Sequence, residues 1–193
     1  QLQIHLFTSD FHLFFFLNRP MPDLIPVLDK ETIARKVDQI ARQISSDYKD
    51  ANLVLLGVLK GAFVFMADLI RRLDLKQVTI DFIQLSSYGD GGDSSGRIGL
   101  LKDVDVDIRG KDVLIVEDIL DTGLTLDYLK KHLERSQPRS VKICVMIDKF
   151  ERRKVDVQAE YIGHKVSEGF LVGYGLDYAE AYRHLPGIFH LTF

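Results

Sequence analysis

The sequence contains one cysteine, no strong excess of charge of either sign and no long apolar run. Lys and Arg number 25 against 28 Asp and Glu, a net charge of -3 at pH 7, so the basic face that general nucleic-acid binding requires is not expected. No apolar run approaches the ~20 residues of a membrane-spanning helix. Cys144 has no intrachain disulfide partner and lies in the apolar run 141–147. We therefore expect it to pack as a small hydrophobic side chain in a reducing, cytoplasmic setting.

Common metal and nucleotide signatures are also missing. The six histidines show neither His-x-x-x-His nor cysteine-paired spacing, so a zinc site is not expected. The chain has no Gly-Lys-Ser/Thr of the Walker type and no three-glycine dinucleotide fingerprint. Four aspartates, Asp103, Asp105, Asp107 and Asp112, alternate near a polar connection. We interpret them as a solvated face.

Residues 1–20 differ from the rest of the chain. They are rich in phenylalanine, and Met21-Pro22 resembles a natural start. The segment has neither the basic region nor the small-residue cleavage site of a secretory signal. We interpret it as an extension or an expression remnant, with a partner-binding or core-covering segment as the alternative, and assign it no function. Residues 21–193 are then long enough for one domain with one substantial core.

Hydrophobic patterns predict an α/β fold. Asp29 is a candidate N-cap for a helix whose apolar residues recur every three or four positions, at Ile33, Val37, Ile40 and Ile44. Continuous apolar runs predict strands that are covered on both faces. Strands are expected at 53–58, 78–85, 112–117 and 141–147, short strands near 159–163 and 170–175, and further helices at 62–73 and 124–135. Alternating strands and helices indicate a parallel sheet.

Residues 86–99 predict a mobile loop. They include five glycines and four serines and almost no apolar side chain. Because the segment exceeds the usual connection length, a lid or a binding loop is expected.

The stretch 113–125 carries the strongest functional signal. Apolar residues 113–116 lead into the adjacent carboxylates Glu117 and Asp118, and a polar turn then opens a helix. Ligands of open α/β sheets bind beyond the carboxyl ends of the strands, where both carboxylates fall. The turn would point N–H groups and two hydroxyls into an anion site that suits a phosphate, while the carboxylates suit the hydroxyls of an attached ribose, or a metal. The turn residues are Asp121, Thr122, Gly123, Leu124 and Thr125.

This pattern resembles the phosphoribosyl pyrophosphate signature of the type I phosphoribosyltransferases; an acidic strand-to-helix turn without a ligand is the alternative. The resemblance covers nearly all of 21–193. It implies a central, mostly parallel twisted sheet flanked by helices, a small hood formed by the N- and C-terminal segments, and a flexible active-site loop. It also implies Mg²⁺ as cofactor and a homodimer or homotetramer. The turn would hold the 5-phosphate, Glu117 and Asp118 the ribose and the metal, and Asp121 would be the catalytic base at purine N7.

Two further segments resemble the bacterial hypoxanthine-guanine branch of that family. Leu59-Lys60-Gly61 resembles its pyrophosphate loop, in which a non-proline cis peptide precedes the lysine; the alternative is a helix-entry turn. Ser87-Tyr88 resembles the start of its flexible lid, which keeps water from the reacting centre.

The carboxy-terminal residues resemble the base pocket of the same branch. Lys149 would donate to the purine 6-oxo group, Phe170 would stack on the base and the Leu171 backbone would read its edge. Asp177 is assigned to the purine site and, through water, to the metal, and Arg183 to the pyrophosphate. The alternatives are an exposed strand-end lysine, a core aromatic ring and two surface charges.

The sequence therefore predicts a purine-salvage enzyme. It would transfer the 5-phosphoribosyl group of phosphoribosyl pyrophosphate to N9 of hypoxanthine or guanine, giving IMP or GMP and pyrophosphate. One alternative keeps the reaction but takes xanthine or another oxopurine. The other is a ligand-sensing RNA-binding regulator on the same fold.

Overall fold

A six-stranded sheet forms the centre of the computed structural model, which describes residues 22–88 and 97–192. Its order is β4-β3-β2-β5-β6-β7, and every neighbouring pair is parallel except β3 and β4. The strands are β2 (Leu53–Leu59), β3 (Val78–Tyr88), β4 (Arg97–Lys102), β5 (Asp112–Leu120), β6 (Ser140–Lys149) and β7 (Tyr161–Val166). The predicted α/β class with a mostly parallel sheet is confirmed.

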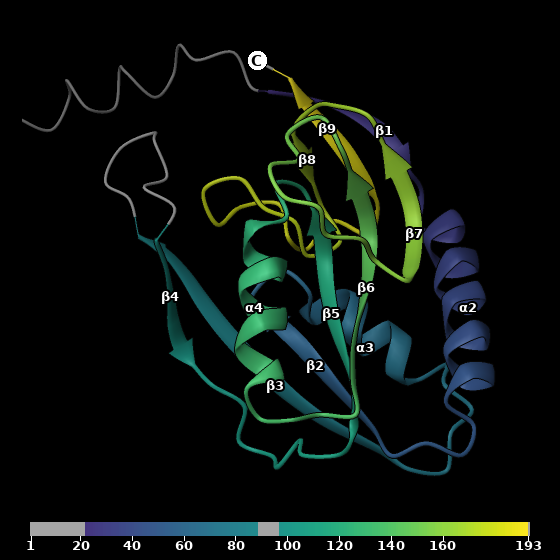
Figure 1. Ribbon diagram of the computed structural model, residues 1–193. Coiled ribbons are helices and arrows are strands. Elements are labelled where there is room, and N and C mark those ends of the chain that lie inside the picture. The colour runs from purple at the N-terminus through teal and green to yellow at the C-terminus, as the bar shows by residue number, and fades with distance from the viewer. Residues whose placement is uncertain (1–21, 89–96, 193) are drawn as a thin grey trace, which may run out of the picture.

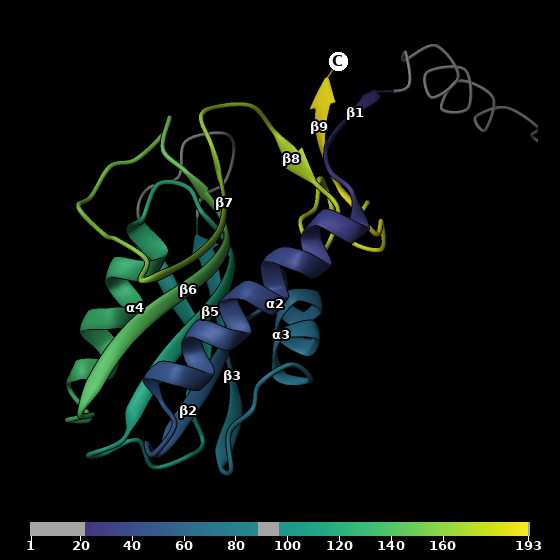
Figure 2. The same ribbon diagram turned by 90° about the vertical axis from the view of Figure 1, so that its right-hand side faces the viewer.

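Helices cover both faces of this sheet (Figures 1 and 2). The helices α2 (Lys30–Asp47) and α3 (Phe63–Ile70) pack on one face, and α4 (Leu124–Glu134) packs on the other. In β5, Leu114 and Val116 belong to the first core and Val113 and Ile115 to the second. The continuous apolar sequence of β5 is explained by this burial on both sides.

Helix α2 begins at the expected residue and buries the expected apolar side chains. The Asp29 carboxylate accepts a hydrogen bond from the Thr32 amide at 2.7 Å, so it is the N-cap. The four apolar residues that recur along α2 are all buried in the core. Among the helices of the described residues, none has the length and apolarity needed to cross a membrane.

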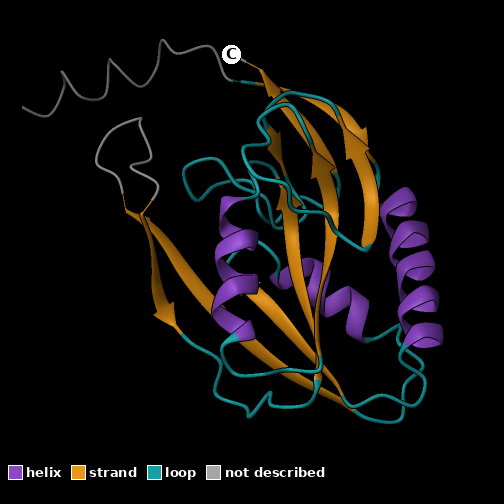
Figure 3. Cartoon of the chain, viewed as in Figure 1, coloured by secondary structure: helices purple, strands orange, loops and turns teal. Residues whose placement is uncertain are grey.

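A second, three-stranded sheet lies beyond the carboxyl ends of β5 and β6 (Figure 3). Its antiparallel strands follow the order β1-β9-β8. They are β1 (Asp23–Leu28), β8 (Leu171–Val172) and β9 (Ile188–Thr192). The sequence patterns predicted neither β1 nor β9, and β8 is shorter than the strand expected at 170–175. The assignment of 21–193 to one domain with a hood stays a prediction, and this sheet is the feature to which it refers.

Three other expectations need correction. The polar segment 86–99 is not all loop, because Ser86, Ser87 and Tyr88 pair with Gly99, Ile98 and Arg97; backbone pairing does not require apolar side chains. The helix expected at 62–73 ends at Ile70. Asp103, Asp105 and Asp107 are exposed as expected, but Asp112 is buried and bonded to Arg139 and Ser140.

Candidate active site

The acidic end of β5 and the turn behind it line a cavity of about 210 Å³. Glu117 and Asp118 lie on its strand side, and residues 121–123, Thr125 and Leu126 on its helix side. The two acidic residues and the predicted phosphate turn therefore line one cavity. This is the arrangement predicted for a phosphorylated sugar.

Burial strongly perturbs the two adjacent carboxyl groups. Both residues are 8% exposed. Burial, together with the charge of Asp118, raises the pKa of Glu117 well above its usual range. Burial also raises the pKa of Asp118, although the charge of Arg183 opposes the shift. Within the protein alone the ionised pair is undersatisfied, and hydroxyl donors or a cation would stabilise it.

The turn depends on Gly123, which has φ of +83° and stands at the start of α4. A Cβ there would lie 2.9 Å from a methyl of Val155 and 3.3 Å from Cδ of Arg153. Glycine meets both demands, a left-handed backbone and a close neighbour. Gly123, the N-cap residue, has no side chain to cap the helix, and the Leu124 amide donates a long hydrogen bond of 3.4 Å to Thr122 Oγ1.

Asp121 and Lys149 bring an acceptor and a donor together at the ends of β5 and β6. Lys149 Nζ lies 3.6 Å from Asp121 Oδ1 and 3.7 Å from a carboxylate oxygen of Glu151. Asp121 Oδ1 is buried and has no hydrogen-bond partner within the described part of the chain. Lys149 is 6% exposed, so it is not the exposed strand-end lysine of the alternative interpretation.

The loop after β2 joins this site from the neighbouring strand. The Leu59–Lys60 peptide is cis, as the family resemblance implied. Gly61 lies against Asp118, and a Cβ on Gly175 would overlap the Gly61 carbonyl oxygen. The Lys60 ammonium forms an exposed ion pair with Glu180 at 3.0 Å. The predicted pyrophosphate loop therefore contacts both the acidic strand end and the 175–183 loop.

Asp177 and Arg183 are neither isolated nor fully exposed. The Arg183 guanidinium forms an ion pair with Asp177 at 2.7 Å and donates to the Gly175 carbonyl at 2.7 Å. Asp177 also accepts a hydrogen bond from the Glu180 amide at 2.9 Å. The two predicted ligand-binding charges are thus held in one loop, close to Lys60 through Glu180.

Phe170 is 46% exposed and is therefore not a core aromatic residue. Its ring meets Tyr178 edge to face, with centroids 5.5 Å apart. Leu171 follows in β8 and is buried. Phe170 is thus open enough to contact a ligand.

The structure leaves two parts of the predicted site undescribed. Ser87 and Tyr88 end β3, but their side chains and the loop 89–96 lie outside the described residues.

Across 22–88 and 97–192, no three His, Cys, Asp or Glu side chains group closely enough to bind a metal by themselves. Mg²⁺ sites commonly use one or two carboxylates and complete the shell with water and substrate phosphates, so this finding is compatible with Glu117 and Asp118 as ligands.

A residue absent from the sequence prediction, Arg153, lies directly behind the turn. Its guanidinium donates to the Asp121 carbonyl at 2.9 Å and to the Asp148 carboxylate at 2.6 Å. In the sequence it is one of several charges in Glu-Arg-Arg-Lys after β6. No local pattern distinguishes it from its neighbours.

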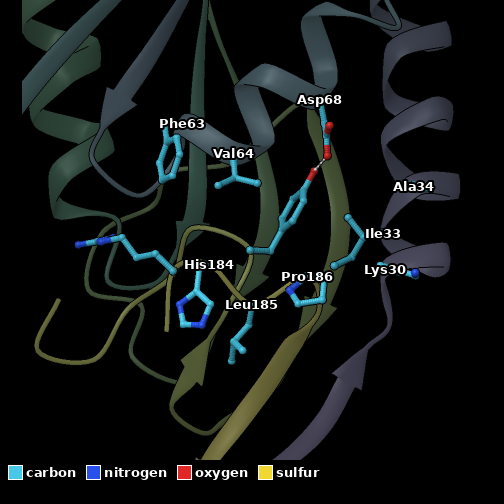
Figure 4. A pocket seen from close by; sticks show the side chains of 11 residues that line it. Lys30, Ile33, Ala34, Phe63, Val64, Asp68, His184, Leu185 and Pro186 are labelled. Atoms are coloured by element: carbon cyan, nitrogen blue, oxygen red, sulfur yellow. Dashed lines mark hydrogen bonds between the residues drawn. The ribbon is translucent and has the colours of Figure 1, made fainter. Parts of the chain in front are cut away.

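A separate cavity of about 450 Å³ lies between α2, α3 and residues 183–186 (Figure 4). Apolar side chains such as Ile33, Val64 and Leu185 line much of it, and Tyr174 donates a hydrogen bond to Asp68 at 2.8 Å. Of the predicted site residues whose side chains the structure describes, only Arg183 borders this cavity. The acidic strand end and the turn belong to the other space.

Comparisons with known proteins agree with this geometry. Residues 26–179 match the family model described as phosphoribosyl transferase domain. The chain is 49% identical to a hypoxanthine-guanine phosphoribosyltransferase of Aquifex aeolicus, over 84% of this chain and 92% of the relative. It is 46% identical to the hypoxanthine phosphoribosyltransferase of Escherichia coli K12, over the same shares. A hypoxanthine phosphoribosyltransferase structure from Staphylococcus aureus superposes with a TM-score of 0.83 at 43% identity, covering 86% of this chain and 90% of that chain.

Proposed function

This chain belongs to the phosphoribosyl transferase domain family, and from that premise we propose that it is a purine-salvage enzyme specific for hypoxanthine and guanine. It transfers the 5-phosphoribosyl group of phosphoribosyl pyrophosphate to the purine. A bond forms between ribose C1 and purine N9, the bond from C1 to pyrophosphate breaks, and IMP or GMP is released with pyrophosphate.

The pairing of Lys149 with Asp121 carries the proposal. An oxopurine with a proton on N7 presents an acceptor, O6, directly beside a donor, N7–H. The buried Lys149 ammonium and Asp121 Oδ1, which accepts no hydrogen bond from the described residues, lie 3.6 Å apart and offer the matching donor and acceptor. Adenine would place a 6-amino donor against the Lys149 donor, so the pair favours hypoxanthine and guanine. Phe170 stacks on the base, with the Leu171 backbone and Asp177 at its edge.

The ribose 5-phosphate fits the cavity at the end of β5. Residues 121–125 bind the 5-phosphate through amides and hydroxyls at the start of α4, where the helix dipole also favours an anion. Glu117 and Asp118 accept hydrogen bonds from the 2- and 3-hydroxyls. Those donors supply the stabilisation that the buried carboxylates lack within the protein.

Lys60, Gly61 and Arg183 bind the pyrophosphate group. Mg²⁺ would be held by Glu117, Asp118 and, through water, Asp177, and it supplies positive charge that stabilises the leaving group. The buried carboxylate pair is a donor set that suits such a hard cation. We assign to the loop that begins at Ser87 and Tyr88, most of which lies outside the described residues, the role of keeping water from the reacting sugar.

Asp121 acts as the base. As the bond from C1 to pyrophosphate lengthens, positive charge develops on the ribose and N9 approaches C1. Electron density then leaves the purine ring, and the Asp121 carboxylate takes or shares the proton on N7. General-base assistance of this kind is typically worth 10² to 10⁴ in rate.

The setting of the enzyme is part of the same proposal. We place it in the cytoplasm, because its buried free thiol, Cys144, suits a reducing compartment. We also propose a homodimer or homotetramer, which the family resemblance favours; light scattering on the purified chain measures the mass. Neither a membrane nor nucleic acid is expected as a partner.

Pyrophosphate release with five bases tests the proposed function. The purified chain is assayed with phosphoribosyl pyrophosphate, Mg²⁺ and, in turn, hypoxanthine, guanine, xanthine, adenine or uracil. Fast release with hypoxanthine and guanine supports the proposal, and a preference for xanthine supports the oxopurine alternative. The variant Lys149→Gln is the matched control for base recognition, and it should lose the preference for oxopurines. Salt-dependent RNA binding without any turnover would overturn the proposal in favour of the regulator.

A further inference from the structure

Arg153 connects the turn at the end of β5 to the end of β6. It follows β6 by four residues, and its side chain is 22% exposed. The guanidinium donates to a carboxylate and to four backbone carbonyls: Asp148 Oδ1 at 2.6 Å, Val157 O at 2.8 Å, Asp121 O at 2.9 Å, Lys149 O at 3.2 Å and Leu120 O at 3.3 Å. One side chain thus contacts the backbones of both residues of the base-recognition pair, Asp121 and Lys149.

The backbone next to Arg153 completes this contact. The Lys154 amide donates to the Thr122 carbonyl at 2.9 Å. The consecutive carbonyls of Leu120, Asp121 and Thr122 are therefore all bound from the side of residues 153–154. In a planar trans peptide the N–H group points opposite to the carbonyl. The amides of residues 121–123 consequently point away from residues 153–154, and these same three residues line the cavity at the end of β5.

We propose that Arg153 is a positioning residue for catalysis, on the premise of the function proposed above. By holding the carbonyls, it aims the turn amides at the 5-phosphate, and it sets the distance between the Asp121 carboxylate and the Lys149 ammonium. It does not touch the substrate. Its effect passes through the backbone of the turn and the strand end.

Guanidinium geometry is necessary for this role. A planar fork with five N–H donors reaches several carbonyls at once, whereas a lysine ammonium concentrates its donors at one point. Arg153→Lys therefore keeps the charge but releases part of the turn. Displacing reacting groups by about 1 Å can cost ~100-fold in rate.

The chain offers a matched control at the opposite end of the same two strands. Arg139 precedes β6, and its guanidinium donates two hydrogen bonds to Asp112, the first residue of β5: one from Nε at 3.0 Å and one from Nη2. Arg139→Lys should weaken a comparable link between β5 and β6 without disturbing the site. Both variants are compared by thermal unfolding, by calorimetric binding of phosphoribosyl pyrophosphate without a base, and by kcat with hypoxanthine well below either Tm.

Arg153→Lys should weaken phosphoribosyl pyrophosphate binding and lower kcat, each by about 10-fold. Arg139→Lys should lower the Tm but change binding and kcat by less than about twofold. If both variants lose stability and neither changes binding or kcat, Arg153 is only structural and the inference is overturned. If the wild-type chain neither binds nor turns over phosphoribosyl pyrophosphate, the proposed function fails first, and the inference with it.

Asp148→Asn is a second variant that tests the same inference if Arg153→Lys does not fold. It removes the charge that holds one guanidinium nitrogen and leaves Arg153 in place. Binding and kcat should then fall together, by about threefold. Unchanged binding and kcat in a folded Asp148→Asn enzyme would overturn the inference.

Discussion

Gly61 lies so close to Asp118 that no larger residue fits at position 61 without moving the Asp118 side chain or the loop. A Cβ built on Gly61 would stand 2.6 Å from Cγ of the Asp118 carboxyl group. The loop after β2 and the acidic end of β5 are thus in direct contact. Any substitution of Gly61 must move one of them.

Gly61→Ala should therefore impair the reaction strongly. Because the added methyl displaces the Asp118 carboxylate or the loop, kcat/KM for phosphoribosyl pyrophosphate should fall by about 100-fold. Steady-state kinetics at saturating hypoxanthine measures this. Gly110→Ala is the control: it strains a backbone with φ of +67° but meets no atom within 4 Å. It should cost about 1 kcal/mol of stability and leave the kinetics unchanged; equal kinetic effects in both variants would refute the steric account.

Asp121→Asn tests the base. The amide keeps the size of the side chain but cannot take the N7 proton, so kcat should fall by at least ~100-fold while substrate affinity is largely retained. Pre-steady-state product formation and equilibrium binding separate the two effects. A near-wild-type kcat would remove Asp121 from this role.

Glu117→Gln should stabilise the free protein while it weakens substrate binding. The substitution removes one of two adjacent buried carboxylates whose pKa values burial raises. Relief of their repulsion should add about 1 kcal/mol of stability, or ~2–4 °C in Tm for a chain of this size. Affinity for phosphoribosyl pyrophosphate with Mg²⁺ should fall by about 10-fold or more, since a charged acceptor is lost. A lower Tm for Glu117→Gln would contradict the interpretation that the two buried carboxylates destabilise the free protein.

The pH dependence of stability should show the contribution of Asp112. The hydrogen bond from Arg139 lowers the pKa of Asp112 below its usual value. A depressed folded-state pKa means that the stabilisation is present above the unfolded value of ~3.9 and is lost as the pH falls through the folded value. Asp112→Asn should cost about 1–3 kcal/mol at pH 7, and the difference from wild type should shrink below pH ~3.9. Urea unfolding at both pH values measures it; a difference that stays constant with pH would assign the effect to packing.

The parallel sheet and the position of the polar turn after β5 could be predicted because their signals are local. Strand β5 reads as an apolar run, and the polar turn follows it directly, so its place at the strand end needs no tertiary information. The cis peptide before Lys60 was predicted from the family resemblance and not from the residues themselves. The same holds for the roles of Lys149 and Phe170, because a lysine at a strand end and an isolated phenylalanine have no distinctive local pattern.

The features that were missed depend on contacts between remote segments. Strand β1 carries mostly exposed residues and includes Pro26, so its pairing with β9 leaves little trace in the sequence. Asp112 and Arg153 resemble surface charges until the packing of their partners is known. Burial of a charge depends on the tertiary structure, and a single sequence reports it poorly.

The three-stranded sheet β1-β9-β8 also constrains the order in which parts of the enzyme can fold. Asp23 of β1 and Thr192 of β9 are 169 residues apart in the chain, yet they are paired, and β9 in turn holds β8, next to Phe170. Closing so long a loop is entropically costly and contributes to slow folding steps. While the chain is being synthesised, β9, which holds the backbone of Phe170, emerges from the ribosome after every other strand described here. A nascent chain can therefore complete the acidic end of β5 and the turn after it before β9 holds Phe170 in place.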